Sequence, residues 1–266
     1  MFNRCPICNS EEFENMFEGW VRCIKCRVVY NRQRQLPNYT QSDWTLSSVD
    51  PDGKLRNILE EREDKLKNWY GDDISYVNKL KPGRILDIGC GPGFFLSAID
   101  ERWEKHGIEP SSQAAEYAKS INDINVISGR LEDANYPKGF FDIVYVYHVI
   151  EHLSDPKAML KEVNRIVKLG GRLIVGTPNI DSFCARRFKQ NFRLLQDPGH
   201  IILFGSHTLC SLLKAYGFQV GKIKYPFFRT KYFTMKNLLR LFDTSKVSPP
   251  FYGNIMTAYA IKEREI

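Results

Sequence analysis

Acid–base side chains gather in one short stretch of the 266-residue chain, Tyr147–His152. His148, Glu151 and His152 have i, i+3, i+4 spacing, so they would share one face of a helix. Because an imidazole titrates near neutral pH, His152 is the first choice for a general base that removes a proton from a hydroxyl or amine. Glu151 would orient that base or hold a substrate hydroxyl, and His148 would contact a cofactor or substrate. The alternative is that Glu151 and His152 only cap and orient the loop.

Four of the seven cysteines form two Cys-x-x-Cys pairs near the N-terminus, separated by 14 residues. Four thiolates complete a tetrahedral shell, which is typical of structural zinc in a reducing compartment. A module this small cannot fold on its hydrophobic core alone, so the metal would supply most of its stability. We therefore predict a zinc ribbon over residues 1–34, with the ligands Cys5, Cys8, Cys23 and Cys26.

A glycine-rich turn, Gly89–Gly93, follows the apolar run Arg84–Ile88 and precedes a predicted helix. Glycines allow a sharp turn and a close ligand approach, and the N-terminus of the helix offers free N–H groups. Glu109 lies 22 positions after Asp87, near the interval of about 20 residues at which an acid meets ribose hydroxyls in nucleotide-binding folds. The spacing is G-x-G-x-G, whereas a pyrophosphate site has G-x-G-x-x-G. The sequence therefore predicts a cofactor with a free ribose diol.

These residues need a sheet to bring them together. The apolar runs predict strands over 84–88, 105–109, 124–128, 141–146, 171–176, 218–224 and 255–262. Between them, the spacing predicts helices over 93–102, 111–121, 156–168 and 206–216. Alternating strands and helices predict a mostly parallel sheet, and ligands bind beyond the carboxyl ends of such strands. The glycine turn, Glu109 and the Tyr147–His152 stretch should therefore meet at one edge.

Four motifs occur in this order along the chain: Asp87–Gly93, Phe141–Val144, Glu151–Leu153 and Leu169–Leu173. An acid followed by G-x-G-x-G, with these later motifs, resembles the class I S-adenosylmethionine-dependent methyltransferases over roughly residues 80–262. The resemblance implies an α/β fold with a Rossmann-like, seven-stranded, mostly parallel sheet and an antiparallel last strand. It also implies a cofactor site made of Asp87, Gly89, Cys90, Gly91, Gly93, Glu109, Pro110, Leu131, Glu132 and Tyr147.

The resemblance also indicates where an acceptor would bind. In related small-molecule methyltransferases a P-x-H-L-x-x-F-S segment lines the acceptor pocket, and Pro198–Gly205 is similar to it. His200 is therefore a second candidate for the base. We predict a methyltransferase domain over 81–266, with acceptor-site insertions at 177–205 and 225–254.

Residues 35–80 are predicted to join the ribbon to this domain as a linker followed by helices over 54–70 and 74–80. In the family, segments ahead of the first strand often cover the cofactor. The aromatic candidates for such a cover are Tyr39, Trp44, Trp69 and Tyr70, with ordinary packing as the alternative.

The positive charge is concentrated near the C-terminus. Residues 180–266 hold 14 of the 38 basic side chains but only 5 of the 31 acidic ones, and the whole chain carries +7. This asymmetry favours a phosphate-bearing small molecule, a nucleic acid or a membrane surface as partner, unless it is only a solvated face. The basic and aromatic segment 222–242 predicts a substrate lid, a peripheral membrane contact or an RNA contact. Alternatively, its aromatic residues pack into the core or against a second copy.

The prediction is therefore an S-adenosylmethionine-dependent methyltransferase for a small-molecule acceptor, such as a sugar or nucleotide-sugar. O-methylation by base-assisted, in-line displacement is the default chemistry. The first alternative is an RNA methyltransferase, although the ribbon region lacks a dense basic stripe. The second is a non-catalytic scaffold whose ribbon docks a partner. No apolar run reaches about 18 residues and no apolar leader is evident, which predicts a cytoplasmic protein.

Overall fold

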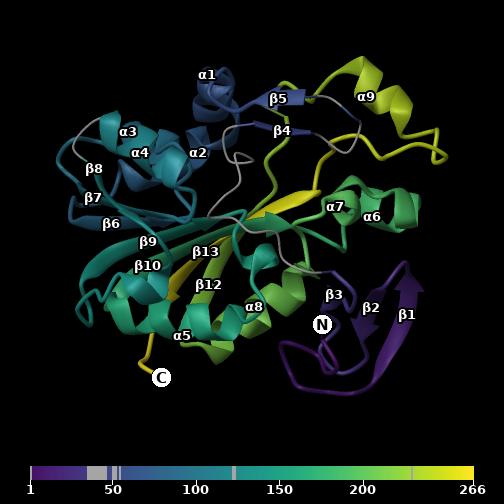
Figure 1. Ribbon diagram of the computed structural model, residues 1–266, viewed down its shortest axis with the longest axis horizontal. Helices are drawn as coiled ribbons and strands as arrows, with labels where there is room; N and C mark the ends of the chain where they lie inside the picture. Colours follow the sequence, from purple (N-terminus) through teal and green to yellow (C-terminus); the bar gives the residue numbers. More distant parts are fainter. Residues whose placement is uncertain (1, 35–46, 50–52, 54, 122–123, 229) are drawn as a thin grey trace.

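The computed structural model describes residues 2–34, 47–49, 53, 55–121, 124–228 and 230–266. Its centre is a seven-stranded sheet in the order β12-β13-β10-β9-β6-β7-β8 (Figure 1). The strands are β6 (Arg84–Ile88), β7 (Glu104–Glu109), β8 (Ile124–Ser128), β9 (Phe141–Tyr147), β10 (Val167–Pro178), β12 (Phe218–Lys224) and β13 (Ile255–Lys262). Neighbouring strands are parallel except at β13, which is antiparallel to both β10 and β12. The predicted fold class is confirmed.

Helices cover both faces of this sheet (Figure 1). They are α2 (Gly71–Val77), α3 (Phe94–Ser97) and α4 (Ser112–Ser120) on one face, and α5 (Pro156–Ile166) and α8 (Ser206–Ala215) on the other. Strand side chains alternate between the faces, so Leu86 and Val144 pack in the α5 and α8 layer while Ile85 and Ile143 pack under α2 and α3. Burial on both sides explains why these strands are apolar throughout.

The segment ahead of the sheet differs from the predicted helix over 54–70. Leu55–Asn57 instead forms strand β5, which pairs with β4 (Ser47–Val49). The helical part begins later, as α1 (Arg62–Asp64) and a π-helical turn, Lys65–Trp69. Leu55 is 79% exposed, so this apolar side chain belongs to no buried helical stripe. The helix predicted over 93–102 is likewise only the single turn α3, and the predicted cover residues Tyr39 and Trp44 lie outside the described residues.

The N-terminal module is hydrogen-bonded to the rest of the fold through a shared sheet. Its three strands are β1 (Phe13–Phe17), β2 (Trp20–Cys23) and β3 (Val29–Asn31). The two-residue strand β11 (Ile202–Leu203) pairs with β3 and completes a four-stranded sheet in the order β1-β2-β3-β11. Ile202 pairs with Tyr30, and Leu203 pairs with Val29. Tyr30 also belongs to the same hydrophobic cluster as residues of α5 and α8. The module is therefore held by backbone pairing as well as by apolar packing.

The remaining helices are α6 (Phe183–Phe188), α7 (Arg193–Gln196) and α9 (Met235–Arg240). The basic and aromatic segment 222–242 is partly packed inside the fold and partly exposed at the surface. Phe227 is buried and its ring lies 5.1 Å from that of Phe251, whereas Phe228, Leu239 and Phe242 are exposed. Within the described part of the chain, no helix has the length and apolar character needed to span a membrane.

Candidate active site

A cavity of about 520 Å³ opens at the carboxyl ends of β6, β7 and β9. Its volume is in the range of small-molecule sites, about 300–1,000 Å³. All but one of the predicted cofactor residues line it, together with three of the predicted acid–base residues, His148, His152 and His200. The exceptions are Gly93, which is the N-cap of α3, and Glu151, which lies fully buried behind His148.

The glycine turn has the backbone that its sequence predicts. Gly89 and Gly91 have φ angles of +74° and +52°, which side chains rarely tolerate. A Cβ at Gly89 would lie 2.4 Å from Val149, whereas a Cβ at Gly91 would meet nothing within 4 Å. Because Gly91 lines the cavity, the open space beside it is available to a ligand.

Two buried carboxyl groups face this turn. Glu109 accepts hydrogen bonds from the backbone N–H groups of Gly91 (2.9 Å) and Ser111 (2.8 Å), one on each oxygen. Each oxygen retains a second lone pair, which suits a ribose diol. Burial raises the pKa of Glu109, and burial together with the Glu109 charge raises that of Asp87 well above its ordinary value. A ligand that donates hydrogen bonds or carries positive charge would stabilise both ionised groups.

Aromatic residues from the segment just ahead of strand β6 form part of the cavity wall. Trp69 and Tyr70, both predicted as cover residues, line it, and the Tyr70 ring packs edge-on against Tyr147 at 5.5 Å. The Tyr147 hydroxyl is buried and has no hydrogen-bond partner among the described residues. A buried hydroxyl at a cavity wall calls for a partner, which a bound ligand would supply.

The Tyr147–His152 stretch is not the helix that the spacing suggested. His148 has a φ of +54°, a strained value for a residue other than glycine, and a 3-10 turn covers Ile150–His152. His148 Nδ1 lies 2.7 Å from Glu151 Oε1, so the i, i+3 pair does meet. His152 instead directs Nδ1 to the backbone carbonyl of Gly199, at 2.8 Å.

Glu151 is the centre of the acid–base cluster. Burial opposes its charge, but the hydrogen bond to His148 and the neighbouring imidazoles outweigh burial and lower its pKa to about 2. Thr177 donates to Glu151 Oε2 at 2.9 Å, a contact that sequence reasoning missed. A polar residue at the carboxyl end of an apolar strand is the signal that could have found it.

The other two histidines differ in their electrostatics and contacts. Burial and the nearby His200 lower the pKa of His152 to about 4, so its imidazole is neutral at pH 7. His200 Nε2 lies 3.9 Å from Glu151 Oε1, and its Nδ1 lies 2.7 Å from the carbonyl oxygen of Leu194. His148, Glu151 and His200 place their potential metal-ligand atoms within 4.8 Å of one another. The structure thus brings together all four predicted acid–base residues.

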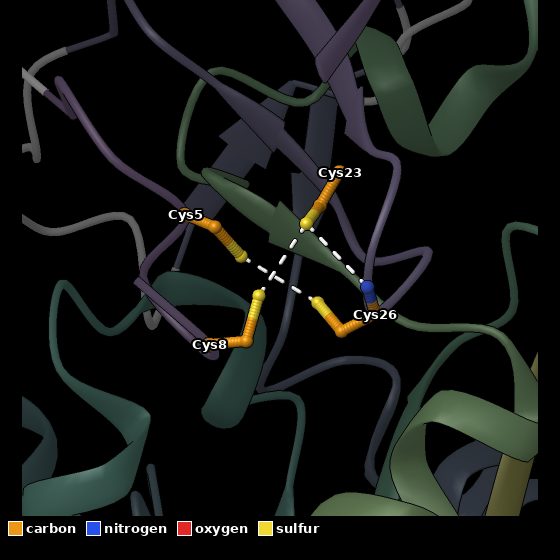
Figure 2. Close-up of side chains that lie close together, drawn as sticks. All are labelled: Cys5, Cys8, Cys23 and Cys26. Atoms are coloured by element: carbon orange, nitrogen blue, oxygen red, sulfur yellow. Dashed lines mark hydrogen bonds between the residues drawn. The ribbon is translucent and has the colours of Figure 1, made fainter. Parts of the chain in front are cut away.

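The four N-terminal cysteines converge on one point (Figure 2). Cys5 Sγ lies 3.5 Å from Cys26 Sγ, and Cys8 Sγ lies 3.5 Å from Cys23 Sγ. All four sulfurs lie within 4.8 Å of one another and none is in a disulfide. Sulfurs about 2.3 Å from a tetrahedral zinc ion are about 3.8 Å apart, so this arrangement fits that metal.

Comparison with known proteins agrees with the geometry of the cavity. Residues 56–223 match the methyltransferase domain family. The chain is 27% identical over 177 residues to malonyl-[acyl-carrier protein] O-methyltransferase of Legionella pneumophila, covering 64% of this chain and 62% of that protein. It is 31% identical over 124 residues to a ubiquinone biosynthesis O-methyltransferase of Xanthomonas oryzae, covering 41% and 48%. The chain thus spans less than two thirds of the length of either relative.

Solved structures share the fold. A SAM-dependent methyltransferase from Archaeoglobus fulgidus superposes with a TM-score of 0.55 at 21% identity, covering 77% of this chain and 99% of that chain. The family match covers more than half of the chain and includes the glycine turn and Glu109. The chain therefore belongs to the methyltransferase domain family and is an S-adenosylmethionine-dependent methyltransferase.

Proposed function

We propose that the chain transfers the methyl group of S-adenosylmethionine to a hydroxyl oxygen of a small-molecule acceptor, such as a sugar or nucleotide-sugar. The observation that carries this proposal is a single cavity that is lined both by the acids Asp87 and Glu109 and by the imidazoles of His148 and His200. In-line displacement needs the donor and the acceptor side by side, and one continuous cavity can hold both.

On the donor side, Glu109 would bind the ribose hydroxyls while Gly91 leaves room for the cofactor. S-adenosylmethionine carries a positive sulfonium and an ammonium group. The buried carboxylates of Asp87 and Glu109 favour a cation in this cavity, because its charge offsets the repulsion between them.

On the acceptor side, His148 is the base that the contacts favour over His152. Its Nδ1–H can donate to Glu151, which leaves the Nε2 lone pair for an acceptor hydroxyl. As the acceptor oxygen attacks the methyl carbon, its proton passes to His148. The carbon–sulfur bond breaks, and its electron pair returns to sulfur to give S-adenosylhomocysteine. Glu151 would stabilise the imidazolium, while His152, with a pKa of about 4, is a weak base.

Cationic side chains support an acceptor that bears phosphate or another anionic group. The cavity wall includes Arg56, Lys65, Arg130 and Arg193. Burial lowers the pKa of Lys65 to about 8, so it remains mostly protonated at pH 7. Arg56 already pairs with Glu61, so Lys65 and Arg130 are the cations that would contact the carboxylate of the cofactor or an anionic group of the acceptor.

The experiment for this proposal measures labelled methyl transfer from S-adenosylmethionine into nucleotide-sugars, phenols and RNA. The labelled methyl group is expected in a nucleotide-sugar or another small molecule. Label confined to RNA, with binding that weakens steeply as salt rises, would establish the RNA alternative instead. Failure to bind S-adenosylmethionine would support the non-catalytic scaffold.

We also propose that the four clustered cysteines hold one structural zinc ion. Protein purified without chelators should contain one zinc per chain by elemental analysis, and Cys8→Ser should lose it and unfold at a lower temperature. Cys210→Ser is the matched control because this thiol lies on α8, outside the cluster. Finding no zinc, or equal zinc loss in both variants, would reject this assignment.

A further inference from the structure

We infer that the N-terminal module positions the acceptor side of the active site, and that Arg34 is the positioning residue through which it acts. The inference rests on the proposed function only for the role of His200 in handling the acceptor. The contacts that support it lie entirely among described residues.

Arg34 connects two parts of the chain that are far apart in sequence. Its guanidinium donates to the backbone carbonyl oxygens of Leu195 (2.6 Å) and His200 (3.0 Å), and also to that of Asp197. The same guanidinium lies over the Trp20 ring of strand β2, 5.0 Å from the ring centroid. One planar group with several donors thus connects the module to three carbonyls between helix α7 and strand β11, the first of them inside α7.

The backbone pairing beside Arg34 extends this connection to Glu151. Asn31 N–H, at the end of β3, donates to the carbonyl of Ile201 at 2.9 Å. Ile201 N–H donates in turn to the backbone carbonyl of Glu151 at 3.0 Å. The module is therefore hydrogen-bonded directly to the backbone of His200 and, through Ile201, to that of Glu151.

Only a short segment carries these contacts. Residues 197–201 lie between α7 and β11, and β11 pairs with the module. Without Arg34, the carbonyls of Leu195, Asp197 and His200 would lose charge-assisted hydrogen bonds, and the His200 ring could move away from Glu151. Gly91 follows β6 and Glu109 ends β7, and the hydrogen bonds of the Arg34 guanidinium to described residues reach neither of them. Loss of Arg34 should therefore disturb the acceptor side and leave the cofactor side intact.

The test compares Arg34→Ala with Arg32→Ala in the full, metal-loaded chain. Arg32 is the matched control because it also lies over an aromatic ring, that of Phe13, and donates to a carbonyl, that of Phe2, but both partners are inside the module. Amide hydrogen exchange is measured across the chain. Arg34→Ala should speed exchange about tenfold or more at residues 200–203, with unchanged exchange at 84–110 and unchanged affinity for S-adenosylhomocysteine.

A second readout follows the imidazole nitrogens of His200 by NMR. Arg34→Ala should shift the His200 signals, Arg34→Lys should restore part of the shift, and Arg32→Ala should leave them in place. Equal effects in Arg34→Ala and Arg32→Ala, or faster exchange throughout the chain, would overturn the inference. Neither readout needs an acceptor, so the inference can hold even if the proposed methyl transfer fails. Once an acceptor is identified, kcat/KM for that acceptor should fall at least tenfold in Arg34→Ala, while the KM for S-adenosylmethionine stays constant.

Discussion

Replacing Glu109 with alanine is expected to weaken S-adenosylmethionine binding about a hundredfold. The variant removes both oxygens that would accept hydrogen bonds from the ribose and also leaves the Gly91 and Ser111 N–H groups without their partner. A loss of about 3 kcal/mol for two hydrogen bonds to a charged group corresponds to that factor. Titration calorimetry with S-adenosylmethionine and S-adenosylhomocysteine measures it.

Glu104→Ala provides the control for this variant. Glu104 begins the same strand, β7, but pairs with Arg84 and His106 near the surface, away from the cavity. Its removal should leave cofactor affinity unchanged within about twofold, as expected for an exposed ion pair. If Glu109→Ala binds the cofactor as well as the wild type does, the placement of the ribose is wrong.

The second large effect is expected from Glu151→Gln, which should lower turnover about a thousandfold while cofactor affinity is retained. The amide keeps the shape of the side chain and can still accept from Thr177, but it cannot stabilise an imidazolium at His148. Steady-state kinetics with an identified acceptor, together with calorimetry, separates the two effects. His148→Ala should cost about as much as Glu151→Gln, because the two side chains act as a unit.

The other histidine variants decide the identity of the base. His152→Ala should reduce turnover less than His148→Ala does, since its pKa of about 4 makes it a weak base. Activity that survives in His148→Ala but disappears in His200→Ala would transfer the role of base to His200. Full activity in Glu151→Gln would instead support the alternative that Glu151 only orders the loop.

Glu151 should also contribute to stability in a pH-dependent way. Its native pKa of about 2 lies below the ordinary value near 4.3, so the folded state favours the ionised form. This contribution is present above pH 4 and is lost as the pH falls from about 4 toward 2. The difference in free energy of unfolding between wild type and Glu151→Gln should therefore shrink over that interval. A difference that stays constant from pH 7 to pH 2.5 would contradict the lowered pKa.

The parts of the fold that could be predicted from sequence have strong local patterns. Short apolar runs such as Arg84–Ile88 are buried on both faces, and Gly89–Gly93 needs positive φ angles that favour glycine. The helix predicted over 156–168 begins where Asp155 accepts from the N–H groups of Lys157 and Ala158, with Pro156 in the first turn. In such places one residue type has one clear structural use.

What could not be predicted depends on distant or unusual contacts. Strand β11 is two residues long and exists through its pairing with the N-terminal module, so no periodicity reveals it. Arg34 reaches carbonyls more than 160 positions away, for which no local pattern exists. The spacing of His148 and Glu151 predicted their contact, but the positive φ at His148, which separates its role from that of His152, has no signal in the sequence.

The most direct test of the account is a coupled measurement of S-adenosylhomocysteine formation and labelled methyl incorporation in one reaction. Wild-type chain should produce both at a one-to-one ratio with a small-molecule acceptor, and Glu109→Ala and Glu151→Gln should depress both together. Glu109→Ala should recover at high cofactor concentration, whereas Glu151→Gln should not. Cofactor binding without transfer to any acceptor tested, or transfer that is indifferent to Glu151, would contradict the proposed active site.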